Sequence, residues 1–220
     1  MVEAFQREVP FSPELHFANL SKMDQTSDPD AIGFFMNEHL KMSGAYWCIG
    51  ALRLLGKLDD SRKDEMVQFI QACQHDCGGF GGNLGHDPHM TSSLYALLIL
   101  AMYGETNKID QDRLVSYVKS LMNEDGSFSG DYAGEVDTRF SYCAVSILSL
   151  LNRLDEIDKE KARDFILQCK NIDGAFGGVP SAESHAAYVF TAVGTLKILG
   201  EIDVLDRDQL GMWLSQRQTI

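Results

Sequence analysis

The sequence predicts an all-α fold, an α/α toroid of tandem helical hairpins that forms an incomplete ring. Two observations lead to this prediction: a repeat of 48 residues, and two differently patterned helices in each repeat. Three kinds of residue recur with this spacing and without a gap. They are Phe80, Phe128 and Phe176; Asp110, Asp158 and Asp206; and Phe69, Tyr117, Phe165 and Trp213. A register shared by phenylalanine, aspartate and mixed aromatic positions indicates internal repeats.

Each repeat contains one amphipathic and one apolar helix, separated by a glycine-rich loop. In DQDRLVSYVKSLM, Leu114, Tyr117, Val118 and Leu121 lie at i, i+3, i+4 and i+7, the spacing of one helix face. The next helix, in EVDTRFSYCAVSILSLL, is apolar on most faces and is therefore expected to be buried. The outer helices are predicted to begin near Asp110, Asp158 and Asp206, and the inner helices near Pro88, Val136 and Ser184.

Buried inner helices favour a toroid over an open solenoid, because a toroid surrounds its inner helices with the outer ones. We expect a single domain over residues 1–220 with about four hairpin repeats. With 45% hydrophobic residues, a chain of 220 residues is long enough to bury one substantial core.

Composition excludes several classes of protein. The longest apolar stretch, LYALLILAMY, is too short to cross a membrane. The stretch Met1–Phe17 has no apolar signal segment, and five scattered cysteines are typical of reduced thiols. We therefore expect a cytoplasmic protein. A net charge of −13 argues against nucleic acid as a partner, since duplex binders carry a basic face.

The stretch CQHDCGGFGGNLGHDPHM contains a loose match to a zinc ligand set, formed by Cys73, Cys77, His86 and His89. The repeat argues against this interpretation. Cys73 shares its register with Leu121 and Cys169, which places it at a core position of a helix. We therefore assign no metal ligand here and expect the chain to bind no zinc tightly.

The starts of the inner helices carry charged and polar residues in register. Asp87, Glu135 and Glu183 are followed two residues later by His89, Asp137 and His185, and then comes Arg139. Parallel inner helices gather their amino-terminal ends at one mouth of a toroid, where exposed N–H groups and helix dipoles favour an anion. Arg139 and His185 would add donors.

The inner faces would line a central cavity with apolar and aromatic side chains. The candidates are Tyr46, Trp47, Leu94, Tyr95, Tyr142 and Tyr188. An apolar funnel with a cationic rim suits a lipid that carries a diphosphate. The pattern is equally compatible with an alternative interpretation, in which His89 and His185 only cap helices and Arg139 only pairs with nearby acids.

Four motifs, KMSGAYW, CQHDCGGFGGNLGHDPH, EDGSFSGDYAGEVDTRFSYCAV and DGAFGGVPSAESHAAYVF, resemble the β subunits of protein prenyltransferases. The resemblance is strongest to the geranylgeranyl transferase type II branch, which modifies Rab proteins. It implies an α/α barrel paired with a helical α subunit. It also implies transfer of geranylgeranyl from geranylgeranyl diphosphate to C-terminal cysteines of Rab GTPases, presented by a Rab escort protein, with zinc activating the thiol.

The resemblance implies roles for individual residues. His185, Ala186 and Ala187 match the motif that contacts the lipid diphosphate, and Arg139 matches an arginine at its edge. Ser43 matches a small residue that deepens the pocket for a twenty-carbon lipid. Tyr46 and Trp47 are predicted to line that pocket.

One part of the family pattern has no counterpart. In the family, an Asp-x-Cys pair and a later histidine bind zinc, after the helix end that corresponds to LSQRQ, Leu214–Gln218. We therefore expect a chain that is C-terminally truncated relative to the family, and leave its catalytic residues unassigned. The alternative hypothesis is a non-catalytic ring that binds the α subunit or escort partner. A terpene-cyclase-like toroid is a third, but DDSRKD has one residue too many for a DDxxD motif.

Overall fold

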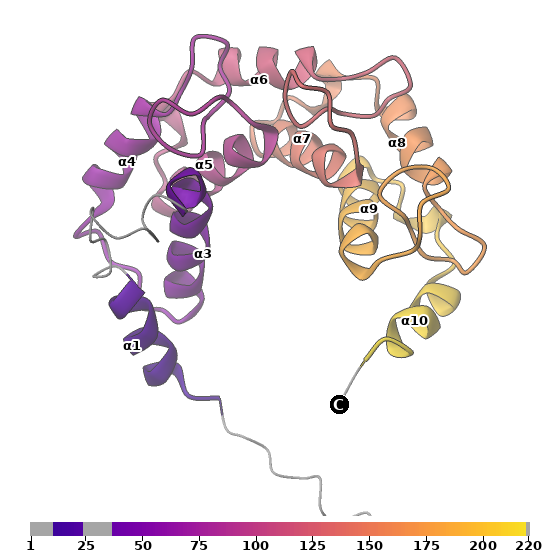
Figure 1. Cartoon of the computed structure of the whole chain (residues 1–220), viewed down its shortest axis with the longest axis horizontal. Coiled ribbons are helices and arrows are strands. Elements are labelled where there is room, and N and C mark those ends of the chain that lie inside the picture. The colour runs from indigo at the N-terminus through magenta and orange to yellow at the C-terminus, as the bar shows by residue number, and fades with distance from the viewer. Residues whose placement is uncertain (1–10, 24–36, 219–220) are drawn as a thin grey trace, which may run out of the picture.

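The computed structural model describes residues 11–23 and 37–218, which form an arc of helices (Figure 1). The main helices are α1 (Pro13–Met23), α3 (Lys41–Leu54), α4 (Lys63–Ala72), α5 (Met90–Tyr103), α6 (Gln111–Ser120), α7 (Thr138–Leu150), α8 (Lys159–Gln168), α9 (Ala186–Leu199) and α10 (Arg207–Ser215). Short 3₁₀ helices are η1 (Glu38–Leu40), η2 (Thr106–Lys108), η3 (Leu154–Glu156) and η4 (Ile202–Val204).

The predicted all-α toroid architecture is confirmed. Helices α3, α5, α7 and α9 line the inside of the arc, and α4, α6, α8 and α10 lie outside them (Figure 1). Neighbouring inner helices pack directly, α3 on α5, α5 on α7 and α7 on α9. Within the described ranges the glycine-rich loops contain isolated β-bridges and no β-strand.

The domain predicted for residues 1–220 includes residues 1–10, 24–36 and 219–220, which lie outside the described part. Most of the stretch Met1–Phe17, which has no apolar signal segment, also lies outside it. None of the described helices is both long enough and apolar enough to span a membrane.

Aspartate caps fix the starts of the outer helices as predicted. The side chain of Asp110 accepts a hydrogen bond from the backbone N–H of Arg113 at 3.0 Å. Asp158 accepts one from Lys161 and Asp206 accepts one from Gln209, each also at 3.0 Å. Such a bond satisfies one of the N–H groups left free at a helix start and stabilises the helix by about 1 kcal/mol.

The inner helices begin two residues after the predicted positions, because the preceding histidine or aspartate is the cap. Their apolar surfaces form the core, together with the phenylalanine of each loop. Phe80, Phe128 and Phe176 are all fully buried. Cys73 is buried as well, so its assignment to a helix-core position is confirmed.

The glycine-rich loops attach each hairpin to the next one. Gly78 and Gly126 have φ of +99° and +87°, in the left-handed region that side chains disfavour. A Cβ on Gly78 would lie 2.1 Å from the carbonyl oxygen of Arg113, and one on Gly126 would lie 2.2 Å from that of Lys161. Only glycine therefore lets these two loops rest on the first turn of the next outer helix.

A second contact between repeats recurs at the starts of the inner helices. The backbone N–H of Met42 donates to the carbonyl of Gly82 at 2.8 Å, and that of Met90 donates to Gly130 at 2.7 Å. Thr138 donates to Gly178 in the same way at 2.9 Å. Each inner helix start is thereby held against the loop of the following repeat.

Candidate functional site

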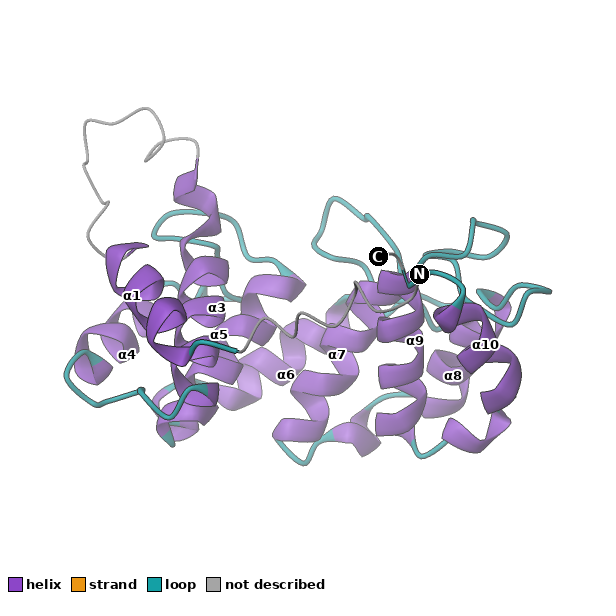
Figure 2. Cartoon of the chain, turned by 90° about the horizontal axis from the view of Figure 1, so that it is seen from below, coloured by secondary structure: helices purple, strands orange, loops and turns teal. Residues whose placement is uncertain are grey.

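The amino-terminal ends of the inner helices meet at one rim of the arc. The long glycine-rich loops stand on the same side, at the top of Figure 2. Because parallel helices add their dipoles at such a rim, and because the first N–H groups of a helix lack helical partners, this rim favours anions.

Histidines cap two of these helices with the same geometry. The Nδ1 atom of His89 accepts a hydrogen bond from the backbone N–H of Thr91 at 3.1 Å, and Nδ1 of His185 accepts one from Ala187 at 3.1 Å. A neutral imidazole whose Nδ1 accepts carries its proton on Nε2. The capping role in the alternative interpretation is therefore confirmed, and it leaves the Nε2–H of each ring as a donor.

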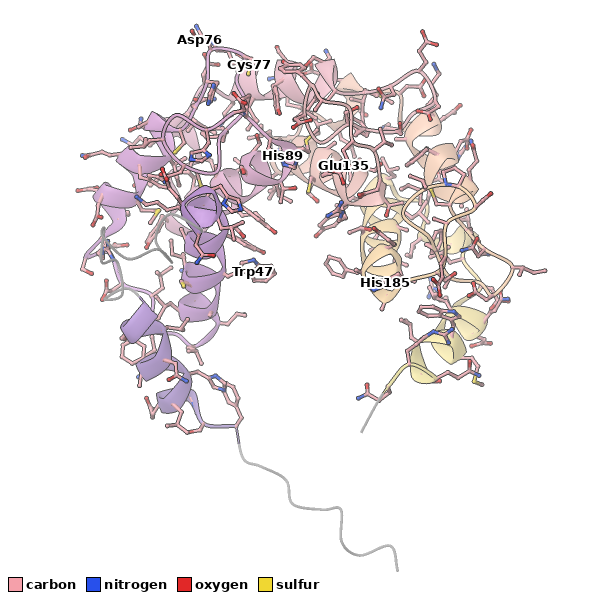
Figure 3. The ribbon with its side chains drawn as sticks, viewed as in Figure 1. Trp47, Asp76, Cys77, His89, Glu135 and His185 are labelled. Atoms are coloured by element: carbon pink, nitrogen blue, oxygen red, sulfur yellow. The ribbon has the colours of Figure 1, made fainter. Side chains whose placement is uncertain are left out.

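The two histidines differ in what surrounds Nε2. His89 is half-buried and its ring meets the edge of Phe140 at 5.5 Å; a Cβ on Gly130 would lie 2.9 Å from its Nε2. Burial lowers the pKa of His89, while Asp131 and Glu135 raise it and Arg139 lowers it. His185 is exposed at the start of α9 (Figure 3), with Tyr188 at 5.8 Å between ring centroids.

Arg139 is held by two carboxylates at the start of α7. Its Nη2 donates to Oδ2 of Asp137 at 2.5 Å and to Oε1 of Glu135 at 3.1 Å. Hydrogen bonding to Asp137 is the main reason that the pKa of Arg139 is raised. The acid pairing in the alternative interpretation is thus also present, and it fixes the guanidinium at the rim with its side chain about half exposed.

Aromatic side chains cover much of the wall below the rim. Tyr46 stacks on Tyr95 with 4.5 Å between ring centroids, and Trp47 lies 5.0 Å from Tyr46 and is 63% exposed. Trp47 projects from α3 into the interior of the arc, toward the side where α9 lies (Figure 3). Burial raises the pKa of Tyr46, and Tyr142 raises it further, so its phenol stays neutral at physiological pH.

Two details of this wall differ from the sequence-based interpretation. Leu94, predicted to line the cavity, is only 3% exposed and belongs to the core. Phe190, which is not among the predicted lining residues, is 63% exposed and meets Tyr142 edge-on at 5.3 Å. The 48-residue repeat could have identified Phe190 as a lining residue, since it shares a repeat position with Tyr46, Leu94 and Tyr142.

The remaining candidates lie along the same rim. Ala186 and Ala187 form the exposed first turn of α9, next to His185. Ser43 is half-buried in the first turn of α3, at the repeat position that Arg139 and Ala187 occupy on their helices. The structure therefore places Ser43 on the rim, with α5 and α7 between its helix and α9.

The residues of the loose zinc match do not form a metal site. Burial raises the pKa of Cys73 to about 11, which disfavours the thiolate that binds metal. Nε2 of His75 bonds to the carbonyl of His86 at 2.7 Å, and His86 lies 3.5 Å from Glu38. Within residues 11–23 and 37–218 no three His, Cys, Asp or Glu side chains are grouped to hold a metal. The described residues therefore do not fit a zinc ion.

Comparisons with known proteins agree with this architecture. The chain is 52% identical over 73 residues to the probable geranylgeranyl transferase type-2 subunit beta of Dictyostelium discoideum, covering 33% of this chain and 22% of that protein. It is 51% identical over 62 residues to geranylgeranyl transferase type-2 subunit beta 1 of Arabidopsis thaliana, covering 28% of this chain and 19% of that protein. The aligned stretches thus span about a fifth of these relatives.

A solved structure shares the fold. The Candida albicans protein geranylgeranyltransferase-I complexed with GGPP superposes with a TM-score of 0.79 at 21% identity, over 96% of this chain and 65% of that chain. The family model described as the prenyltransferase alpha-alpha toroid domain matches residues 11–220. The repeat, the ring of paired helices and this match together show that the chain belongs to the prenyltransferase α/α toroid family, and its aligned relatives are protein prenyltransferase β subunits.

Proposed function

We propose that the chain is a cytoplasmic β subunit of a type II protein geranylgeranyltransferase. In this proposal it pairs with an α subunit and moves geranylgeranyl from geranylgeranyl diphosphate to C-terminal cysteine thiols of Rab-type GTPases. A Rab escort protein presents those substrates. The names of the aligned relatives support the type II assignment.

One observation carries the lipid-binding part of the proposal: an anion-favouring rim lies directly above an aromatic wall. His185 offers its Nε2–H at the rim, and Arg139 offers guanidinium N–H groups that Asp137 and Glu135 hold in place. One turn below, Tyr46, Trp47 and Tyr142 present aromatic surface. A diphosphate would bind at the rim by charge-assisted hydrogen bonds, and its isoprenoid chain would lie on the wall.

The chain's residues orient the lipid in this proposal, and none of them is assigned to activate the thiol. The zinc expected for the family does not fit the described residues, so no step of the reaction is routed through it here.

Lipid titration and a transfer assay test the proposal. The chain, expressed with an α subunit, should bind geranylgeranyl diphosphate more tightly than farnesyl diphosphate and should transfer labelled lipid to a Rab GTPase with its escort protein. Binding without transfer would favour the non-catalytic alternative. Absence of binding to either lipid would overturn the proposal.

Ser43 provides a sharper test of lipid length. Ser43→Trp should fill the space beside the wall and weaken binding of the twenty-carbon lipid about tenfold relative to the fifteen-carbon lipid, because overfilling an apolar site is costly. Ser43→Thr, a small change at the same position, is the matched control and should keep the wild-type preference. An unchanged preference in Ser43→Trp would show that Ser43 does not set lipid length.

A further inference from the structure

The ring of Tyr142 lies directly against a glycine of the neighbouring inner helix. A Cβ on Gly194 of α9 would lie 2.6 Å from Cε2 and 2.8 Å from Cδ2 of Tyr142, which is on α7. Real Cβ atoms do not approach ring carbons so closely. Phe190, one turn earlier on α9, meets the same ring edge-on at 5.3 Å. Gly194 and Phe190 thus form a notch that holds Tyr142.

The repeat provides an internal reference for this glycine. The equivalent positions are Gly50 on α3, Leu98 on α5 and Ser146 on α7, so the backbone of an inner helix accepts a side chain at this position. A Cβ on Gly50 would meet nothing within 4 Å. Glycine inside a helix is unfavourable relative to alanine at both positions. Of these two glycines, only Gly194 has a neighbouring side chain, Tyr142, that leaves no room for a Cβ.

We propose that Gly194 is a specificity-determining residue that sets the width of the lipid cavity, by letting the edge of the Tyr142 ring pack directly against α9. This inference rests on the proposed lipid-binding function. Tyr142 follows Arg139 by one turn on α7, so a lipid held at the rim passes this ring. Gly194 itself does not touch the diphosphate site at the rim; it acts through the position of Tyr142.

A side chain at 194 would displace the ring in one direction. The Cδ2–Cε2 edge of Tyr142 faces the backbone of α9 at Gly194, and Phe190 meets the same ring edge-on. The ring would therefore move away from α9, toward the interior of the arc that α3, α5, α7 and α9 line (Figure 1). The displaced ring would therefore narrow the path below the rim. It would obstruct an isoprenoid chain and leave a bare diphosphate unaffected.

Two matched substitutions separate this effect from a change in helix stability. Gly194→Ala and Gly50→Ala both replace a helix-interior glycine at the same repeat position, so both gain helix propensity equally. In the chain expressed with an α subunit, Gly194→Ala should bind geranylgeranyl diphosphate about tenfold more weakly than wild type. Gly50→Ala should bind it as wild type does. Inorganic pyrophosphate should bind equally to all three proteins.

A double substitution tests whether the effect passes through Tyr142. Adding Gly194→Ala to Tyr142→Leu should change lipid affinity less than about twofold, because the smaller side chain no longer meets the new Cβ. If Gly194→Ala binds lipid as tightly as wild type, or if its loss persists in the Tyr142→Leu background, the inference is overturned. A loss of pyrophosphate binding in Gly194→Ala would equally overturn it.

Failure of the proposed function gives a different result. If wild type binds no geranylgeranyl diphosphate, both the proposed function and this inference fall; if wild type binds and Gly194→Ala is unaffected, only the inference falls. Circular dichroism and melting temperature monitor folding. Should Gly194→Ala not fold, recovery of folding in the double variant would support the steric coupling, and its absence would overturn it.

Discussion

His89 and His185 occupy the same repeat position on α5 and α9, and their environments differ although their backbones agree. Both have extended φ and ψ angles, −139° and 144° against −140° and 139°, and both cap their helix through Nδ1. His89 lies beneath Gly130 and Phe140 of the following repeat, while His185 is exposed. The repeat therefore fixes the cap, and the neighbouring repeat decides whether the other ring nitrogen is available to a ligand.

On α7, between α5 and α9, the same repeat position is occupied by Asp137, a cap that also binds an arginine side chain. Its side chain is buried and accepts a hydrogen bond from the backbone N–H of Arg139 at 2.7 Å, while also binding the guanidinium of the same residue. One repeat position thus contains a covered histidine, a carboxylate that orients an arginine, and an exposed histidine. The chemistry available at the rim therefore depends on which side chain occupies this position, because the backbone conformation of the cap is extended in all three repeats.

The largest expected effect is on the free energy of unfolding, and it differs between the loop of Gly126, which packs on the backbone of α8, and the last loop, that of Gly174. Gly126→Ala would force a side chain onto φ of +87° and place its Cβ against the backbone carbonyl of Lys161, so we expect a loss of about 3 kcal/mol or more in the free energy of unfolding. Gly174 has a similar φ, but the atoms nearest to its Cβ would belong to the side chain of Gln209, which can move. Gly174→Ala should cost about 1–2 kcal/mol.

Urea unfolding of the two variants beside wild type measures this difference. Equal losses would mean that the contact of the Gly126 loop with the Lys161 carbonyl does not add to the destabilisation, and that the left-handed φ alone explains both results. A larger loss in Gly174→Ala would contradict the comparison between covered and open repeats.

The next effect concerns lipid binding, and it assumes the proposed function. His185→Ala removes an exposed Nε2–H donor, and a charge-assisted contact of about 1.5–3 kcal/mol corresponds to roughly ten- to a hundredfold weaker binding of geranylgeranyl diphosphate. His89→Ala removes an equivalent cap whose Nε2 is covered by the next repeat. It should cost about 1 kcal/mol of stability and leave lipid affinity within about threefold of wild type. Isothermal titration of both variants decides the matter, and equal losses of affinity would show that capping, rather than contact, controls the rim.

The sequence was sufficient for the architecture because periodic information determines it. Apolar spacing, aspartate caps and glycine loops each repeat every 48 residues, and the helices begin within about two residues of the predicted positions. The burial of Cys73 followed from its register alone. These features depend on the local chain and on repetition.

The details of the site depend on contacts between repeats, which no single repeat contains. Leu94 and Phe190 share one repeat position, yet the first is covered by its neighbours and the second is open. The difference in exposure between His89 and His185 has the same origin. The notch formed by Gly194 required the orientation of Tyr142 across two helices. Sequence spacing names the residues on a face, and packing decides which of them reach the cavity.

The smallest expected effect is the pH dependence of stability that His89 contributes. Burial lowers its pKa in the folded chain relative to the ordinary value of 6.5, against the opposing effects of Asp131 and Glu135. The unfolded chain therefore binds a proton more readily than the folded one below that value. The stabilisation is present above pH 6.5 and is lost as the pH falls through 6.5 toward the lowered pKa, with a slope of at most about 1.4 kcal/mol per pH unit.

Protonation also abolishes the cap of α5, because a proton on Nδ1 removes the acceptor for the N–H of Thr91. His89→Asn is the matched variant, since asparagine is a good N-cap and does not titrate. We expect unfolding free energies measured between pH 7.5 and about 5 to fall less steeply in His89→Asn than in wild type. The parallel His185→Asn variant provides the comparison: it replaces the exposed histidine of the other capped helix. If both substitutions flatten the profile equally, the cover provided by Gly130 and Phe140 does not control the titration of His89, and the contrast between the two histidines fails.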